Sequence, residues 1–322
     1  MSDAVIEAAA RLIREGKLVA FPTETVYGLG ANALEAAAVE QIFVVKGRPQ
    51  TSPLIVHVSS LEMARGLVVD WPERAAALAE RFWPGPLTLV LPKSPCVPDR
   101  VTAGLPTVGI RMPQHPVALD LIRAAGVPIA APSANRFTEL SPTTAAHVRR
   151  AFGDRIAMIL DGGTTDVGIE STVLSLADVQ PLLLRPGMVT RAQIEEAVGP
   201  VLAASGVAGR PHASPGMHPR HYSPATPLLI VDGGALPEHG HGAYLWRETP
   251  GACQQSIQMP LGAREYARQL YDTLHKLDVL GLEWIAVERP PLTVDWAGIS
   301  DRLERAADRS ERPNDRTSEP RS

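Results

Sequence analysis

The chain has 322 residues, an apolar fraction of 45% and a formal net charge of −4. These values indicate a globular protein that is long enough for two domains. The negative net charge excludes binding to nucleic acid through overall charge. The two cysteines have no metal-ligand spacing and are too few for a disulfide framework. No apolar run approaches the roughly 18 residues of a membrane span, and the N-terminus lacks a signal peptide's features. We therefore expect a cytoplasmic protein that does not bind membranes.

The first 202 residues alternate between helical and strand patterns. Apolar residues recur at three- and four-residue spacing in the predicted helices, which are 3–16, 34–45, 60–68, 72–82, 116–125, 143–152 and 190–198. Apolar and β-branched runs predict strands at 17–22, 53–58, 87–92, 107–113, 127–132, 156–161, 171–176 and 181–187. Several neighbouring strands have no helix between them, so we expect an α/β domain with a mixed sheet rather than a purely parallel one.

The composition changes after residue 202, the predicted end of the first domain (1–202). Residues 203–226 are dominated by Gly, Pro, His and Ser without an apolar period, which is typical of a linker. Residues 227–308 return to a βα pattern, which predicts a small Rossmann-like or flavodoxin-like domain. Residues 309–322 are charged and aperiodic, so we expect a disordered tail.

A polar nonapeptide, PTETVYGLG (22–30), follows the first predicted strand. It is either a turn between a strand and a helix or a polar cradle for a ligand. We expect Gly28 and Gly30 to let the backbone turn tightly into the next helix. Glu24 is either a ligand contact or the internal partner of a nearby cation.

Cationic and polar residues also gather at strand ends and in one loop. Lys46 and Arg48, in the loop KGRP, suit a polyphosphate, although such a tetrapeptide is also typical of a solvated turn. Arg111, in an apolar strand, requires either a protein carboxylate or an anionic ligand. Ser133 and Asn135 follow a strand, where they either contact a ligand or start a turn. Neither a Walker A pattern nor GxGxxG occurs, and no GxSxG marks a nucleophile.

Taken in chain order, these motifs strongly resemble the YrdC-type family, the L-threonylcarbamoyladenylate synthases. The motifs that carry the resemblance are PTETVYGLG, KGRP followed by PLIVHV, WPGPLTLVL, VGIRMP, PSAN followed by SPT, VGIESTV and LLRPG. SPGMHPRHYSP followed by a small βα domain resembles the longer, two-domain form of the family. The similarity spans residues 5–308.

The resemblance implies a twisted mixed sheet with a concave cavity and a small C-terminal Rossmann-like domain. It implies a nucleotidyltransferase that makes threonylcarbamoyl-AMP from L-threonine, bicarbonate and ATP and releases pyrophosphate. The product would serve the modification of the adenosine next to the anticodon of tRNA, through a separate threonylcarbamoyl transferase. Mg²⁺ would accompany ATP without a metal site on the protein, and weak direct binding of tRNA or other RNA is left open.

The resemblance also implies roles for individual residues. The L-threonine site would comprise Thr25, His57, Arg111, Ala131 and Ser171. The ATP site would comprise Lys46, Arg48, Ser52, Thr107, Ser133, Asn135, Ser141, Arg185 and Tyr222. Lys46 and Arg48 would be the catalytic residues, because they neutralise phosphate charge. Residues 203–226 would form either a lid that brings Tyr222 over the nucleotide or a passive tether between the domains.

Two other functions compete with this interpretation. An RNA-binding module could use the same cations on a concave face, but it would not need His57 or Ser171. A carbamoyl-transfer domain of the kind found in hydrogenase maturation factors would come with zinc fingers and an acylphosphatase-like segment, and the chain has neither. Both comparisons favour the synthase.

Overall fold

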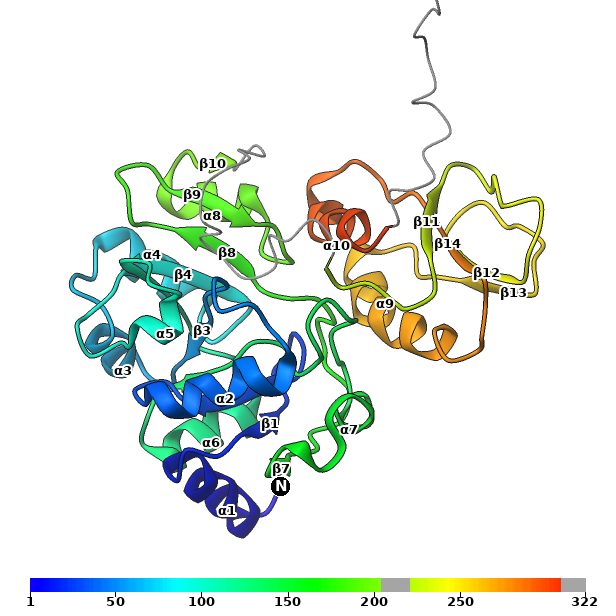
Figure 1. The fold of residues 1–322 in the computed structure, drawn as a ribbon. Helices are drawn as coiled ribbons and strands as arrows, with labels where there is room; N and C mark the ends of the chain where they lie inside the picture. Colours follow the sequence, from blue (N-terminus) through cyan, green and yellow to red (C-terminus); the bar gives the residue numbers. More distant parts are fainter. Residues whose placement is uncertain (204–220, 308–322) are drawn as a thin grey trace, which may run out of the picture.

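The computed structural model describes residues 1–203 and 221–307. They form an N-terminal and a C-terminal α/β unit that pack against each other (Figure 1). Most of the expected lid, 204–220, and the expected disordered tail, 309–322, lie outside the described residues. Within the described part, no helix is both long and apolar enough to cross a membrane.

The N-terminal unit is built on a mixed sheet that has ten strands in the described residues. The strands are β1 (Val19–Phe21), β2 (Gly28–Asn32), β3 (Ile55–His57), β4 (Leu87–Pro92), β5 (Thr107–Arg111), β6 (Ile129–Ala130), β7 (Met158–Ile159), β8 (Thr172–Ser175), β9 (Leu182–Arg185) and β10 (Leu202–Ala203). Their order is β10-β9-β8-β4-β5-β3-β6-β2-β1-β7. Parallel pairs such as β3–β5 stand beside antiparallel pairs such as β4–β5, which confirms the mixed sheet expected from the sequence.

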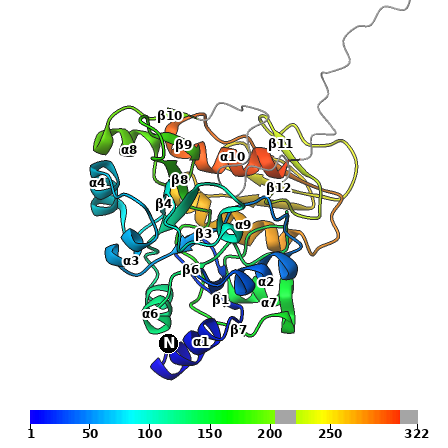
Figure 2. The same ribbon diagram turned by 60° about the vertical axis from the view of Figure 1, so that its left-hand side comes forward.

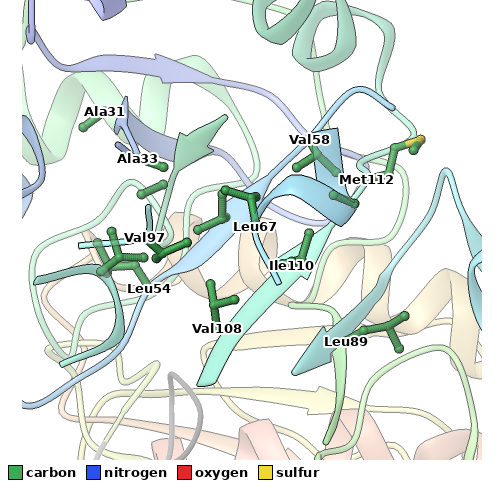
Figure 3. Close-up of a cluster of buried hydrophobic side chains, with 14 of the residues drawn as sticks. Ala31, Ala33, Leu54, Val58, Leu67, Leu89, Val97, Val108, Ile110 and Met112 are labelled. Carbon is green, nitrogen blue, oxygen red and sulfur yellow. The ribbon is translucent and has the colours of Figure 1, made fainter. Parts of the chain in front are cut away.

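Helices cover both faces of this sheet. They are α1 (Asp3–Arg14), α2 (Ala36–Lys46), α3 (Leu61–Gly66), α4 (Glu73–Phe82), α5 (Asp99–Thr102), α6 (Pro116–Ala125), α7 (Ala145–Phe152), the 3₁₀ turn η1 (Gly153–Arg155) and α8 (Arg191–Val198). Because side chains alternate along a strand, Leu18 and Ala20 join the larger hydrophobic cluster, whereas Val19 and Phe21 pack with α1 and α6. Figure 3 shows part of the larger cluster. In Figures 1 and 2, α1 lies at the end of this unit remote from the C-terminal unit.

The end of the polar nonapeptide differs from its prediction. Gly28 and Gly30 belong to β2, which pairs antiparallel with β1, so the predicted tight turn into a helix was wrong. Neither glycine has a positive φ. A Cβ at Gly30 would lie 2.7 Å from the Phe21 ring and 2.8 Å from Ile129. Glycine is therefore needed at position 30 for close packing against Phe21 and Ile129, and not for a reversal of the backbone.

The C-terminal unit is a four-stranded parallel sheet in the order β11-β14-β12-β13. Its elements are β11 (Leu228–Val231), β12 (Gly242–Trp246), β13 (Gln255–Gln258), α9 (Ala263–Leu277), β14 (Trp284–Glu288), the 3₁₀ turn η2 (Val294–Trp296) and α10 (Ala297–Ala306). They confirm the βα pattern that the sequence predicted for residues 227–308. The sequence did not predict β13, because this strand is a mostly exposed edge strand of polar residues and has no apolar pattern.

The two units share a buried surface along α9 and α10, which lie between the C-terminal sheet and the N-terminal unit (Figure 1). Val26 and Ile169 of the first unit belong to the same hydrophobic cluster as the two helices. The backbones approach closely at two glycines. A Cβ at Gly168 would overlap the carbonyl oxygen of Ala267, and one at Gly298 would lie 2.9 Å from the Cα of Gly187.

We predict that Gly168→Ala weakens the packing between the units far more than a matched substitution nearby. Gly163 has the same φ of +82° but nothing within 4 Å of its Cβ position, so Gly163→Ala reports backbone strain alone. That strain costs about 1–2 kcal/mol. Gly168→Ala adds the overlap with α9 and should lower the free energy of unfolding by at least about 3 kcal/mol, as measured in urea. Equal losses in the two variants would contradict the close-packing argument.

Candidate functional site

A cavity of about 50 Å³ lies where the nonapeptide, several strand ends and the segment around Tyr222 meet. Many residues that the family resemblance placed in a site line it: Thr25, Arg48, His57, Arg111, Ala131, Ser133, Ser171, Arg185 and Tyr222. The sequence did not single out other lining residues as site residues, namely Thr23, Val26, Gly28, Ile55, Pro132, Glu170 and His221. The fold thus gathers residues from both proposed subsites around one space.

Arg111 is a buried cation held by three protein contacts. Its Nη2 lies 2.7 Å from Oε1 of Glu24. Nη1 donates to Oγ1 of Thr25 (2.9 Å), and Nε donates to the carbonyl oxygen of Gly85 (3.2 Å). Of the two alternatives left by the sequence for the partner of Arg111, the protein carboxylate is therefore present. Glu24 is correspondingly an internal partner of a cation.

His57 lies beside Arg111, because β3 and β5 pair these two residues in register. Burial and the positive charge of Arg111 lower the pKa of His57 to about 3. The imidazole is therefore neutral at physiological pH. Its Nδ1 is buried without a hydrogen-bond partner among the described residues.

Arg48 and Lys46 differ in their contacts, although both are buried. Arg48 lines the cavity, and burial lowers its pKa to about 10. The ammonium of Lys46 donates to the carbonyl oxygens of Ser133 (2.6 Å) and Asn135. Burial, reinforced by Arg48, holds the pKa of Lys46 well below its usual value. Arg48 therefore faces the cavity, whereas Lys46 supports the loop that presents Ser133.

Arg185 connects Ser171 with Tyr222, which lies near the end of the expected linker. Its Nε donates to the carbonyl oxygen of Ser171 (3.1 Å), and its Nη2 donates to Oγ of the same residue (3.2 Å). Its Nη1 donates to the hydroxyl of Tyr222 (3.3 Å). Ser171 Oγ also lies 2.8 Å from Oγ1 of Thr88 on β4. The hydrogen bond from Arg185 therefore holds Tyr222 against the wall of the cavity.

The C-terminal unit reaches this wall through Glu170. Arg302 of α10 donates from Nε to Oε2 of Glu170 (2.6 Å), and the Tyr271 hydroxyl donates to the same oxygen (3.2 Å). Ser141 donates to the other oxygen (2.5 Å). The Arg302 guanidinium also lies 5.3 Å from the centre of the Tyr222 ring. One ion pair therefore connects both units with Tyr222.

Sequence reasoning missed Arg302, although a signal was present. Ile299, Arg302, Leu303 and Ala306 recur at the spacing of one helical face, and all four are buried. A cation on the apolar stripe of a helix predicts a buried acidic partner. The partner is Glu170, which lies 132 residues earlier in the chain.

The other residues expected to bind ATP do not line the cavity in this conformation. They are Lys46, Ser52, Thr107, Asn135 and Ser141. Asn135 donates from Nδ2 to the carbonyl oxygens of Arg136 (2.9 Å) and Glu139 (2.7 Å), and Ser141 contacts Glu170. Thr107 lines a separate space of about 10 Å³. Typical small-ligand pockets measure roughly 300–1,000 Å³. The cavity of about 50 Å³ is therefore too small for a nucleotide in this conformation.

Across residues 1–203 and 221–307, no group of three or more His, Cys, Asp or Glu side chains converges as metal ligands would.

We predict that Arg302→Met lowers the free energy of unfolding by about 3–5 kcal/mol, because Glu170 would keep its charge in a buried position without its partner. The control is Arg289→Met, which breaks an exposed pair with Asp232 and should cost no more than about 1 kcal/mol. Urea unfolding curves measure both. Similar small losses would show that the buried pair does not stabilise the packed units.

The depressed pKa of His57 predicts a dependence of stability on pH. Between the ordinary value of 6.5 and the folded value of about 3, the unfolded state binds more protons than the folded state. Stability should therefore fall as the pH drops from 6.5 towards 3, by up to about 1.4 kcal/mol per pH unit from this residue. His57→Gln should have a shallower loss of unfolding free energy between pH 7 and pH 5. Parallel curves for the two proteins would contradict the assignment.

Comparisons with known proteins cover both units. A family model described as "Telomere recombination" matches residues 11–187, and one described as "Threonylcarbamoyl-AMP synthase, C-terminal domain" matches 189–308. Threonylcarbamoyl-AMP synthase of Bacillus subtilis is 45% identical over 327 residues, covering 95% of this chain and 94% of that protein. The Schizosaccharomyces pombe enzyme of the same name is 35% identical over 358 residues, covering 94% of this chain and 88% of that protein.

A solved structure agrees over nearly the same length. The crystal structure of Pyrococcus abyssi Sua5 complexed with L-threonine is 40% identical, covers 95% of each chain and superposes with a TM-score of 0.88. Sequence and fold therefore agree along both units. The chain belongs to the threonylcarbamoyl-AMP synthase family, in its two-domain form.

Proposed function

We propose that the protein synthesises threonylcarbamoyl-AMP from L-threonine, bicarbonate and ATP and releases pyrophosphate. One observation carries the proposal: the cavity combines Arg111, which suits a carboxylate, with Arg48 and Arg185, which suit phosphate oxygens. Membership of the synthase family supports it. The complex of Pyrococcus abyssi Sua5 with L-threonine supports amino-acid binding in particular.

The chemistry requires two bond-forming steps. The amine of threonine loses a proton and attacks the carbon of CO₂, which bicarbonate supplies together with water, and a carbamate forms. A carbamate oxygen then attacks the α-phosphorus of ATP, and pyrophosphate leaves. A carbamate decomposes in water, so an enclosed cavity would protect it. Positioning and charge neutralisation suffice for both steps, and no protein nucleophile is required.

The proposed roles follow the contacts of each group. Arg111 would bind the threonine carboxylate, while Thr25 and neutral His57 would accept hydrogen bonds from its ammonium or hydroxyl group. Ser171 and the Ala131 backbone would complete this side. Arg48, which lines the cavity, and Lys46, which lies farther from it, would neutralise the developing charge on the phosphates.

The remaining ATP contacts would form when the cavity opens. They would come from Ser52, Thr107, Ser133, Asn135, Ser141, Arg185 and Tyr222. Residues 203–226 would act as the lid between a catalytic domain, 1–202, and a Rossmann-like domain, 227–308. Tyr222 already lies against Arg185 at the cavity wall, which supports a closing role.

Mg²⁺ would accompany ATP, since the described residues offer no metal-ligand cluster and phosphate oxygens are its preferred partners. Its contribution would be to offset phosphate charge. The product is a reactive mixed anhydride, so a tRNA threonylcarbamoyl transferase would have to take it up. Because that acceptor is tRNA, we place the reaction in the cytoplasm. Direct RNA binding by this chain would be weak.

Incubation of the purified protein with labelled ATP, L-threonine and bicarbonate should yield threonylcarbamoyl-AMP. Pyrophosphate release should depend on L-threonine, and release without it would refute the function. Arg48→Ala should reduce synthesis at least about 100-fold while the protein stays folded, because a buried positive charge beside the phosphates is lost. The control Arg149→Ala, at an exposed arginine of α7, should retain full activity. Near-normal synthesis by Arg48→Ala would remove the phosphate-binding argument.

A further inference from the structure

We propose that Thr23 and Glu24 are positioning residues that fix the orientation of Thr25 and Arg111 for an amino-acid substrate. The proposal rests on the proposed function, because it concerns how the same site recognises the ammonium and carboxylate groups of L-threonine. Both residues are buried in the nonapeptide, and no role has been given to either in the reaction. They act through their neighbours and need not contact the substrate.

The hydroxyl of Thr23 sets the direction of a short hydrogen-bond chain. Its Oγ1 donates to the carbonyl oxygen of Val26 at 2.6 Å, which uses its single proton. Oγ1 of Thr23 and Oγ1 of Thr25 are 2.8 Å apart. Since Thr23 has no second proton, Thr25 must be the donor in this contact. The hydroxyl proton of Thr25 is therefore used by Thr23.

This polarity makes Thr25 an acceptor towards the cavity. A hydroxyl oxygen has two acceptor positions, and one of them receives Nη1–H of Arg111 at 2.9 Å. The other is left for a donor from outside the chain. Of the groups of an amino acid, the ammonium and the side-chain hydroxyl can donate to it.

Glu24 faces two donor groups, one through an ion pair and one through a hydrogen bond, and only a carboxylate can serve both at once. Oε1 lies 2.7 Å from Nη2 of Arg111, and Oε2 accepts the backbone N–H of Gln114 at 3.0 Å. A glutamine at this position would turn its amide NH₂ towards one of the two donors in either orientation. The amide NH₂ would then face either the guanidinium of Arg111 or the backbone N–H of Gln114, and a donor facing a donor is repulsive.

Nε and Nη1 of Arg111 each donate a hydrogen bond to the chain, and Nη2 meets Glu24 as an ion pair. The guanidinium therefore keeps N–H groups that no hydrogen bond among the described residues uses, and two N–H groups on neighbouring nitrogens can bind a carboxylate through both oxygens. Arg111 lines the cavity, and Glu24 and the carbonyl of Gly85 fix the plane of its guanidinium. Together, Thr25 offers an acceptor for the ammonium or hydroxyl group of an amino acid, and Arg111 offers donors for its carboxylate.

The first test replaces Thr23. Thr23→Val keeps the shape of the side chain but removes the acceptor for the Thr25 hydroxyl and for the backbone N–H groups of Thr25 and Val26. This loss should raise KM for L-threonine at least tenfold and change KM for ATP less than twofold. Thr23→Ser restores the hydroxyl and should restore KM. Thr102→Val makes the same chemical change at a buried threonine outside the cavity, and it should behave as the wild-type protein. Equal increases in both KM values, or no rescue by serine, would overturn the role of Thr23.

The second test replaces Glu24 and measures binding by calorimetry with L-threonine and with L-threoninamide, which lacks the carboxylate. Glu24→Gln should weaken binding of L-threonine at least tenfold and that of L-threoninamide less than threefold. Glu288→Gln, at a carboxylate of the C-terminal unit that accepts three backbone N–H groups, is the control and should change neither value. Equal weakening for both ligands, or none, would overturn the role of Glu24.

The two proposals can fail separately, because calorimetry does not require turnover. A wild-type protein that binds L-threonine but makes no threonylcarbamoyl-AMP would refute the proposed function, and the variants would still test Thr23 and Glu24. A wild-type protein that does not bind L-threonine would overturn the positioning roles as well.

Discussion

The buried ion pair between Glu170 and Arg302 is the interaction on which both the fold and the cavity depend. Its two residues come from different units, and both side chains are buried. Because an unpaired charge in this position would cost several kcal/mol, the units are held in one relative arrangement. Glu170 directly precedes Ser171, and Arg302 lies beside the Tyr222 ring. The same contact therefore aligns a cavity wall with the segment that closes it.

Buried cations lie in and beside the cavity, and some are paired with a carboxylate whereas others are paired with carbonyl oxygens. Arg111 has a carboxylate, Glu24, whereas Lys46 has the carbonyl oxygens of Ser133 and Asn135. Carbonyl oxygens solvate a cation without cancelling its charge. The region around Lys46 and Arg48 consequently keeps positive charge, which would suit the phosphates of ATP in the proposed reaction. The environment of Arg111 is nearly neutral, which suits a zwitterionic amino acid.

Local patterns were sufficient for most of the fold. The apolar periods predicted the helices and strands of both units, and the missing elements have physical reasons. β13 is a polar edge strand, and β2 was taken for a turn because its glycines suggest reversal. Gly30 is instead required by the ring of Phe21, which packs over it from the neighbouring strand. No pattern within the nonapeptide reveals that contact.

By itself, the sequence determined the fold class, the two-unit organisation and the set of residues from which a site could be assembled, because these depend on local periodicity and on motifs in chain order. Only the tertiary structure decided the partners. Glu24 meets Arg111, and Glu170 meets Arg302, across separations of 87 and 132 residues (111 − 24 and 302 − 170). Which charges meet is decided by strand order and by the packing of α10 on the first unit. These arise from burial of apolar surface across the whole chain, which no single segment encodes.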